Sequence, residues 1–148
     1  MNSGGKEHLR QKWNAAFRDL ICNSQAYDHM PVIICGDLNV VATEKDYWKD
    51  YASAIDSGPG LYEFEIKDFH ERQSQFGLVD TYRHFHPDGR DYSWFSYRFA
   101  ARQRGHGWRI DYFLVSKELI PLIIDSKVHS SFLGSDHNPI ELIIKDQE

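Results

Sequence analysis

The sequence contains little cysteine and no long apolar run. Its 148 residues include two cysteines, Cys22 and Cys35, without the Cys-x-x-Cys spacing of a zinc site. Two such cysteines fit a reducing compartment better than a disulfide framework. Cys35 lies in an apolar stretch, which predicts a small core residue. No segment approaches the ~20 apolar residues of a membrane span, and the first residues contain no apolar signal segment. We therefore expect a chain that is neither membrane-embedded nor secreted.

The chain also lacks an excess of positive charge. Its net charge is −5, which argues against a protein that wraps nucleic acid with its whole surface. Residues 90–109 are the exception, because their net charge is +4 while the remainder carries −9. The arginines of this window are Arg90, Arg98, Arg102, Arg104 and Arg109. Aromatic residues are interspersed among them, as in a nucleic-acid-binding loop. A half-buried strand with a solvated basic face would have the same pattern.

Hydrophobic periodicity predicts one domain with helices and several short strands. The predicted helices cover residues 7–22, 63–76 and 117–122, and the predicted strands cover 31–35, 78–80, 91–97, 108–115, 123–129 and 139–145. The inward positions of the first helix are Leu9, Trp13, Phe17, Leu20 and Ile21. Residues 40–62 are expected to form a long surface loop with a short helical turn. We predict an α/β fold of α+β-like character, with one mainly antiparallel mixed sheet and helices on its outer face.

The stretch from Pro31 to Asn39, PVIICGDLN, predicts a buried central strand that opens into a polar loop. Asp37 and Asn39 are two residues apart, so on an extended backbone they point to the same side. Such a pair could hold a water molecule, a metal ion or a phosphate. The same residues also commonly form a turn by capping their own backbone.

Further polar groups interrupt the apolar strands near the end of the chain. Asp111 lies inside WRIDYFLV, where an ionised carboxylate is costly unless it is paired. Asp136 and His137 come just before the last strand. Taken singly, Asp111 could bond a neighbouring Arg or Tyr, and the other two could be loop caps. Taken together with Asp37, carboxylates and a histidine provide the groups for Mg²⁺-assisted phosphodiester hydrolysis.

The motifs GDLN, SWFSYR, GWRIDYFLVS and GSDHNPIELII occur in this order along nearly the whole chain. Together they resemble the exodeoxyribonuclease III/apurinic-apyrimidinic (AP) endonuclease family, within the endonuclease/exonuclease/phosphatase superfamily. The segment NSGG at 2–5 is similar to the one that follows a catalytic tyrosine in that family. The resemblance implies DNA repair: cleavage of double-stranded DNA 5′ to abasic sites, and 3′→5′ exonuclease activity.

The resemblance also implies roles for individual residues. Asp37 would activate the water nucleophile and Asn39 would position it or the phosphate. His137 would contact the scissile phosphate, and Asp111 would orient His137. The residues implied around a Mg²⁺ ion, for which Mn²⁺ could substitute, are Asp37, Asn39, Asp136 and His137. Those implied for the abasic-sugar pocket and the DNA contacts are Trp94, Trp108, Ile110, Arg98 and Arg102.

Two departures from the family pattern matter. Gly58 stands where the family has an asparagine that grips DNA, which puts DNA contacts by that loop in doubt. The family fold is a four-layer α/β sandwich of two similar halves, and the first half carries a metal-binding glutamate, an asparagine and the catalytic tyrosine. Their motifs are absent here. The resemblance therefore identifies residues 1–148 as the C-terminal half of that domain, without the N-terminal half.

The missing half has physical consequences. A half sheet would leave an apolar face uncovered, so we expect either a homodimer or association with an N-terminal half. Catalysis by the chain alone is expected to be impaired. The alternatives are a non-catalytic DNA-binding or assembly fragment, and another phosphodiesterase or phosphatase of the superfamily. The implied location is the bacterial cytoplasm or nucleoid, or the eukaryotic nucleus.

Overall fold

The structure, a computed structural model, describes residues 7–28 and 30–146. Its elements are α1 (Glu7–Asp28), β1 (Ile33–Asp37), α2 (Glu63–Phe76), β2 (Leu78–Asp80), α3 (Thr81–Phe85), β3 (Trp94–Phe95), β4 (Gly107–Trp108), β5 (Asp111–Ser116), β6 (Ile123–Val128) and β7 (Ile140–Ile144). Short 3-10 helices lie at Glu44–Asp46, Ala52–Ala54, Arg98–Ala100 and Lys117–Leu122. The NSGG segment lies outside the described residues. Within them, no helix is long and apolar enough to cross a membrane.

The predicted single sheet is wrong, since the described strands form three small sheets. Their strand orders are β1-β5-β2, β3-β4 and β6-β7, and the neighbouring strands in each are antiparallel. The predicted strand 108–115 is divided at Arg109 and Ile110. The amide of Arg109 donates to the carbonyl of Asp46, which takes it away from a strand partner. One part of the segment therefore pairs with β3 and the other with β1.

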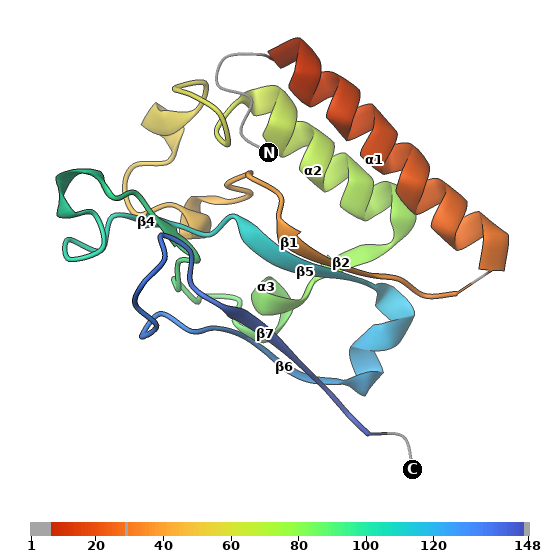
Figure 1. The fold of residues 1–148 in the computed structure, drawn as a ribbon. Coiled ribbons are helices and arrows are strands. Elements are labelled where there is room, and N and C mark those ends of the chain that lie inside the picture. Colours follow the sequence, from red (N-terminus) through yellow and green to blue (C-terminus); the bar gives the residue numbers. More distant parts are fainter. Residues whose placement is uncertain (1–6, 29, 147–148) are drawn as a thin grey trace.

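Helices α1 and α2 lie side by side over one face of the β1-β5-β2 sheet (Figure 1). Phe69 from α2 packs there on Tyr112 and Leu114 of β5. Helix α2 has the predicted bounds, and it ends at Gly77 because the C-cap requires a left-handed backbone, with φ 60°. Helix α3 and the β6–β7 hairpin lie on the other side of this sheet (Figure 1).

The buried stripe of α1 differs from the predicted one. Leu9 and Leu20 are exposed, whereas Arg10 and Asn14 are buried beside Trp13. The guanidinium of Arg10 donates to the carbonyl of Leu38, at 2.7 Å, and this contact draws a polar residue into the stripe. The prediction counted apolar residues and so could not foresee it.

Strand β1 is an edge strand, and the prediction that it is a buried central strand is wrong. Its residues alternate between the helix-covered face and the opposite face, where Ile33, Cys35 and Asp37 are exposed. Cys35 is therefore not a core residue; like Cys22, it is a free, exposed thiol. Loop 40–62 is less superficial than predicted, because Val40 and Val41 are completely buried.

Candidate active site

Asp37 and Asp111 face the same side of the β1-β5-β2 sheet. They are direct partners in the β1–β5 register, so their side chains share a face. Asp111 is the first residue of β5 rather than an interior one, which corrects its predicted position. Because it lies at the strand end, its carboxylate avoids full burial among apolar side chains.

Asp37 forms the turn that was one interpretation of the Asp-x-Asn pattern. Its Oδ1 accepts a hydrogen bond of 2.7 Å from the amide of Asn39. Asn39 has a φ of 49° and is buried, so the expected extended backbone through both residues is wrong. Asn39 instead lies against Gly60, where an added Cβ would come 3.3 Å from the Asn39 carbonyl oxygen and 3.3 Å from the Trp108 ring. Gly60, with φ 89°, thus permits a close approach of two chain segments.

His137 is hydrogen-bonded to Asp111. Its Nδ1–H donates to Oδ2 of Asp111 over 2.9 Å, and the two side chains are 33% and 13% exposed. This hydrogen bond raises the pKa of His137; partial burial opposes the change, and the charges of Asp111, Asp37 and Asp136 reinforce it. The imidazolium form is thereby favoured, with Nε2 left to meet a substrate.

Asp136 is held beside this pair by the β3 strand. The indole N–H of Trp94 donates to its Oδ2 at 3.2 Å, and the amide of Phe95 donates to its carbonyl at 2.9 Å. Although desolvation acts in the opposite direction, the Trp94 hydrogen bond and the His137 charge hold the pKa of Asp136 below its ordinary value. The carboxylate therefore stays ionised near His137.

The three residues predicted to line a pocket come together. The Trp94 and Trp108 rings lie 5.1 Å apart at 61°, and both pack against the buried cluster that contains Ile110. Ser93, which the sequence reasoning missed, is buried beneath them, and its Oγ accepts from the amides of Ile110 and Asp111. A small hydroxyl residue beside a tryptophan gave no recognisable signal for this role.

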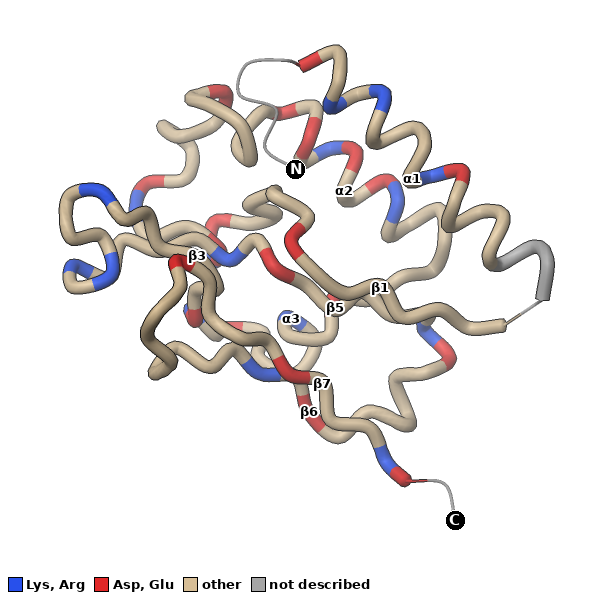
Figure 2. Tube along the Cα trace, in the orientation of Figure 1, with Lys and Arg blue, Asp and Glu red and all other residues tan. Residues whose placement is uncertain are grey.

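Of the two arginines expected to contact DNA, the structure leaves Arg98 exposed on the loop next to β3. Figure 2 shows basic residues gathered on this loop. Arg102 is turned instead toward the segment that precedes β7, where its guanidinium donates to Asn138 Oδ1 at 2.6 Å. DNA contacts by either residue stay predictions.

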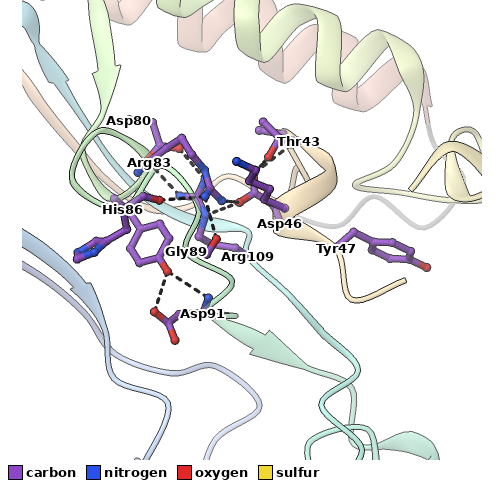
Figure 3. Close-up of polar contacts among 12 residues, drawn as sticks. Thr43, Asp46, Tyr47, Asp80, Arg83, His86, Gly89, Asp91 and Arg109 are labelled. Carbon is purple, nitrogen blue, oxygen red and sulfur yellow. Dashed lines mark hydrogen bonds and ion pairs between the residues drawn. The ribbon is translucent and has the colours of Figure 1, made fainter. Parts of the chain in front are cut away.

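Arg109 does not belong to the basic surface to which its position in the charged window assigned it. It is 1% exposed and bonds Asp46 at 2.6 Å and Asp80 at 2.6 Å. Arg83 reaches the same Asp46 oxygen at 2.6 Å, and Figure 3 shows these side chains converging. The sequence reasoning missed this network, although a charged residue two positions before Asp111 in an apolar segment was a usable signal. The network anchors Arg109, which stands between Trp108 and Ile110 in the chain.

The residues that the structure describes do not by themselves form a metal site. Among residues 7–28 and 30–146, no three His, Cys, Asp or Glu side chains are grouped so that they could hold a metal ion. Asp136 is engaged by Trp94, and Nδ1 of His137 by Asp111. Mg²⁺ prefers six ligands in an octahedron, mostly oxygen atoms, so the available donors do not fit it without ligands from elsewhere.

Comparison with known proteins shows relatives in DNA repair. The chain is 40% identical over 136 residues to an exodeoxyribonuclease of Bacillus subtilis (strain 168), covering 91% of this chain and 52% of that protein. It is 33% identical over 136 residues to the DNA repair nuclease APEX1 of Danio rerio, covering 91% of this chain and 42% of that protein. The chain thus spans about half the length of these relatives.

The fold is also that of solved structures of such enzymes. It matches an AP endonuclease of Leishmania major with a TM-score of 0.89 and 28% identity, over 99% of this chain and 48% of that one. A 3′ phosphatase of Neisseria bound to product DNA gives a TM-score of 0.84 and 26% identity, over 97% and 56% of the two chains. The model of the Endonuclease/Exonuclease/phosphatase family matches residues 4–137. This chain therefore belongs to the endonuclease/exonuclease/phosphatase family.

Proposed function

We propose that residues 1–148 are the C-terminal half of a DNA repair nuclease domain. Its activity is phosphodiester hydrolysis 5′ to abasic sites in double-stranded DNA, together with 3′→5′ exonuclease activity. The observation that carries this proposal is the Asp111–His137 pair, with Nδ1 and Oδ2 2.9 Å apart and Asp37 opposite Asp111 on the neighbouring strand. The relatives that are named as exodeoxyribonuclease and DNA repair nuclease support it. A repair role implies the cytoplasm or nucleoid of a bacterium, or the nucleus of a eukaryote.

Each side chain has a distinct task in this proposal. Asp37 is the exposed carboxylate that takes a proton from the attacking water. His137, held by Asp111, donates from Nε2 to the scissile phosphate, where its positive charge opposes the developing negative charge. Asn39 positions the water or the phosphate. None of these steps forms a covalent intermediate with the chain.

The aromatic cluster supplies selectivity. A missing base lowers the energy needed to extrude a nucleotide, and the paired Trp94 and Trp108 rings over Ile110 would accept a bare sugar more readily than a sugar with its base. Arg98, exposed on the adjacent loop, would contact a phosphate. This explains why aromatic and basic residues share one window of the sequence.

The proposal also requires a partner for the chain. Ile33 on the site-bearing face of β1 is 45% exposed, and Ile124 and Ile144 of the β6–β7 hairpin are 54% and 46% exposed. We propose that an N-terminal half, or a second copy of this chain, covers these residues. The same partner would supply the missing oxygen ligands for Mg²⁺ or Mn²⁺. A single monomeric species in sedimentation at high concentration would exclude self-association.

Reconstitution tests the proposal. The purified chain is mixed with the part of the Bacillus subtilis exodeoxyribonuclease that it does not match, and incision of a duplex with one abasic site is followed with Mg²⁺ and with Mn²⁺. We expect weak incision by either part alone and a large gain in the mixture. His137→Ala should lower the rate of the mixture by about 10²–10⁴-fold. Equal incision by the wild-type and His137→Ala mixtures would refute the assigned site.

The incomplete set of metal ligands favours one other candidate function, a binding or assembly fragment without catalysis. Such a fragment would bind the abasic duplex in fluorescence anisotropy while the mixture fails to cut it. Phosphoinositide and sphingomyelin substrates, offered to the same mixture, distinguish a third alternative, another phosphoesterase of the superfamily. Faster hydrolysis of these substrates than of abasic DNA would decide for that alternative.

A further inference from the structure

Arg102 makes more contacts with one loop than an exposed phosphate-binding side chain would need. Its Nη1 donates to Asn138 Oδ1 at 2.6 Å, and its Nη2 donates to the carbonyl oxygen of Ser135 at 2.8 Å, with that of Asp136 at 3.4 Å. The guanidinium carbon lies 4.6 Å from the centroid of the Phe95 ring. Both nitrogen ends and one face of the side chain are therefore occupied within the protein.

The contacted segment, residues 133–138, is called here the histidine loop, because it carries Asp136 and His137. It begins with the exposed Leu133 and with Gly134 at a φ of 113°. It returns to β3 through two backbone bonds, from the amide of Phe95 to the Asp136 carbonyl and from the amide of Asn138 to the Ser93 carbonyl. Arg102 joins the same loop through the carbonyl oxygens of Ser135 and Asp136, the second of which Phe95 also binds, and through the side chain of Asn138.

We propose that Arg102 is a positioning residue that locks the histidine loop onto β3, so that His137 stays on Asp111. The proposal rests on the function proposed above for that site and adds a residue to it. A planar guanidinium can bind a carboxamide oxygen and a carbonyl oxygen at once while it stacks on a ring, whereas a lysine ammonium offers a single charged point. Geometry, rather than charge, is therefore what position 102 requires.

The alternative is that Arg102 contacts a DNA phosphate, as its place in the basic window predicts. The two roles respond differently to Arg102→Lys. A phosphate contact depends mainly on charge, so a lysine would preserve most of it. The positioning role, called the clamp here, depends on the forked arrangement of the guanidinium N–H donors. Arg102→Lys would therefore lose it nearly as completely as Arg102→Ala.

The first test uses this chain alone and needs no activity. Amide hydrogen exchange and the indole N–H resonance of Trp94, assigned with Trp94→Phe, are measured in wild type and in three variants. In Arg102→Ala and Arg102→Lys we expect exchange at Phe95 and Asn138 to accelerate about tenfold or more, and the Trp94 resonance to move. The amide of Leu38, which bonds the carbonyl of Ile110 directly beside the β1–β5 pair, should keep its wild-type exchange rate.

Arg104→Ala is the matched control, because Arg104 is an exposed arginine of the same loop. It should leave exchange at Phe95 and Asn138 unchanged. Wild-type exchange in Arg102→Lys would overturn the clamp. Equal acceleration at Leu38 would overturn it as well, because the variant would then be loosening the whole fold.

The second test uses the reconstituted nuclease. A clamp predicts a lower kcat with little change in KM in both Arg102 variants, since the histidine loop acts on the chemical step. A phosphate contact predicts a higher KM in Arg102→Ala that Arg102→Lys restores, and this result would overturn the proposal. If the mixture shows no incision, the proposed function fails, while the exchange measurements still decide the role of Arg102.

Discussion

Arg109 and Asp111 are two residues apart, yet the protein uses their charges in opposite ways. Arg109 is 1% exposed and bonds two aspartates, one of which also binds Arg83. Asp111 has one charged partner in the structure, His137, whose side chain remains 33% exposed. The Arg109 guanidinium is buried and paired on both sides, whereas the Asp111–His137 pair remains accessible to solvent. A charged side chain has a structural role when it is buried and its polar groups are all paired, and it can act on a substrate when it is partly exposed, whatever its residue type.

The difference follows from the physics of buried ions. A carboxylate that is removed from water needs charged partners and hydrogen bonds to remain ionised. Asp46 is fully buried and has Arg109, Arg83 and the Thr43 hydroxyl as partners. A site that acts on a substrate must leave a donor or acceptor free, and that requires some exposure. Both regions include residues of the segment 108–111, so the buried network around Arg109 also holds in place the strand end that carries Asp111.

Removal of Arg109 from its buried ion-pair network is expected to lower the unfolding free energy more than any other change considered. Arg109→Ala leaves Asp46 and Asp80 as buried carboxylates without their main cation, so we expect a loss of about 3–5 kcal/mol in unfolding free energy. Urea unfolding followed by circular dichroism measures it. Arg104→Ala, at an exposed position, should change the free energy by less than about 0.5 kcal/mol. A similar small change in Arg109→Ala would mean that the network contributes little.

The stability that the Asp46 carboxylate contributes depends on pH. Although burial raises the pKa of this carboxyl, Arg109, Arg83 and Thr43 outweigh that effect and hold the pKa below its ordinary value. A depressed folded-state pKa contributes stability that is complete above the unfolded value of about 3.9 and is lost as pH falls through the folded value. We expect Asp46→Asn to be less stable than wild type at neutral pH, with a difference that shrinks below about pH 4. A difference independent of pH in this range would contradict the assignment.

Loss of the partly exposed Asp111–His137 pair should lower stability much less than loss of the Arg109 network. His137→Ala removes a partly exposed pair, so the unfolding free energy should fall by less than about 1 kcal/mol. Urea unfolding under the conditions used for Arg109→Ala provides the comparison. A loss as large as that of Arg109→Ala would show that His137 is a structural residue, and the distinction between the two regions would fail.

Local patterns predicted the elements that depend on neighbouring residues. The helix at 63–76, which ends before Gly77, and the short strand at 78–80 follow from periodicity and cap chemistry. The strand at 91–97 is reduced to Trp94–Phe95, and the backbone just before it, at Tyr92 and Ser93, bonds Asn138 instead. Helix α3 was missed because five residues give too short a pattern.

Ser116 shows the same limit at a single residue. A serine directly before a helix commonly caps it through its side chain, and Ser116 stands before the helix predicted at 117–122, which forms as a 3-10 helix. Its hydroxyl oxygen instead accepts from the amide of Val32, at 2.8 Å, across the sheet. A partner 84 positions away in the chain cannot be read from a local pattern.

The order of the motifs in the sequence was enough to identify the family, and it singled out the groups that are proposed for the site. Only the tertiary structure decided what each charge does. Arg109 and Arg102 belonged to one basic window in the sequence, yet one is buried between two aspartates and the other binds the histidine loop. Burial depends on what packs above a residue, and that is set by segments distant in the chain. The charge of a side chain follows from its residue type, whereas its partner and its exposure are properties of the fold.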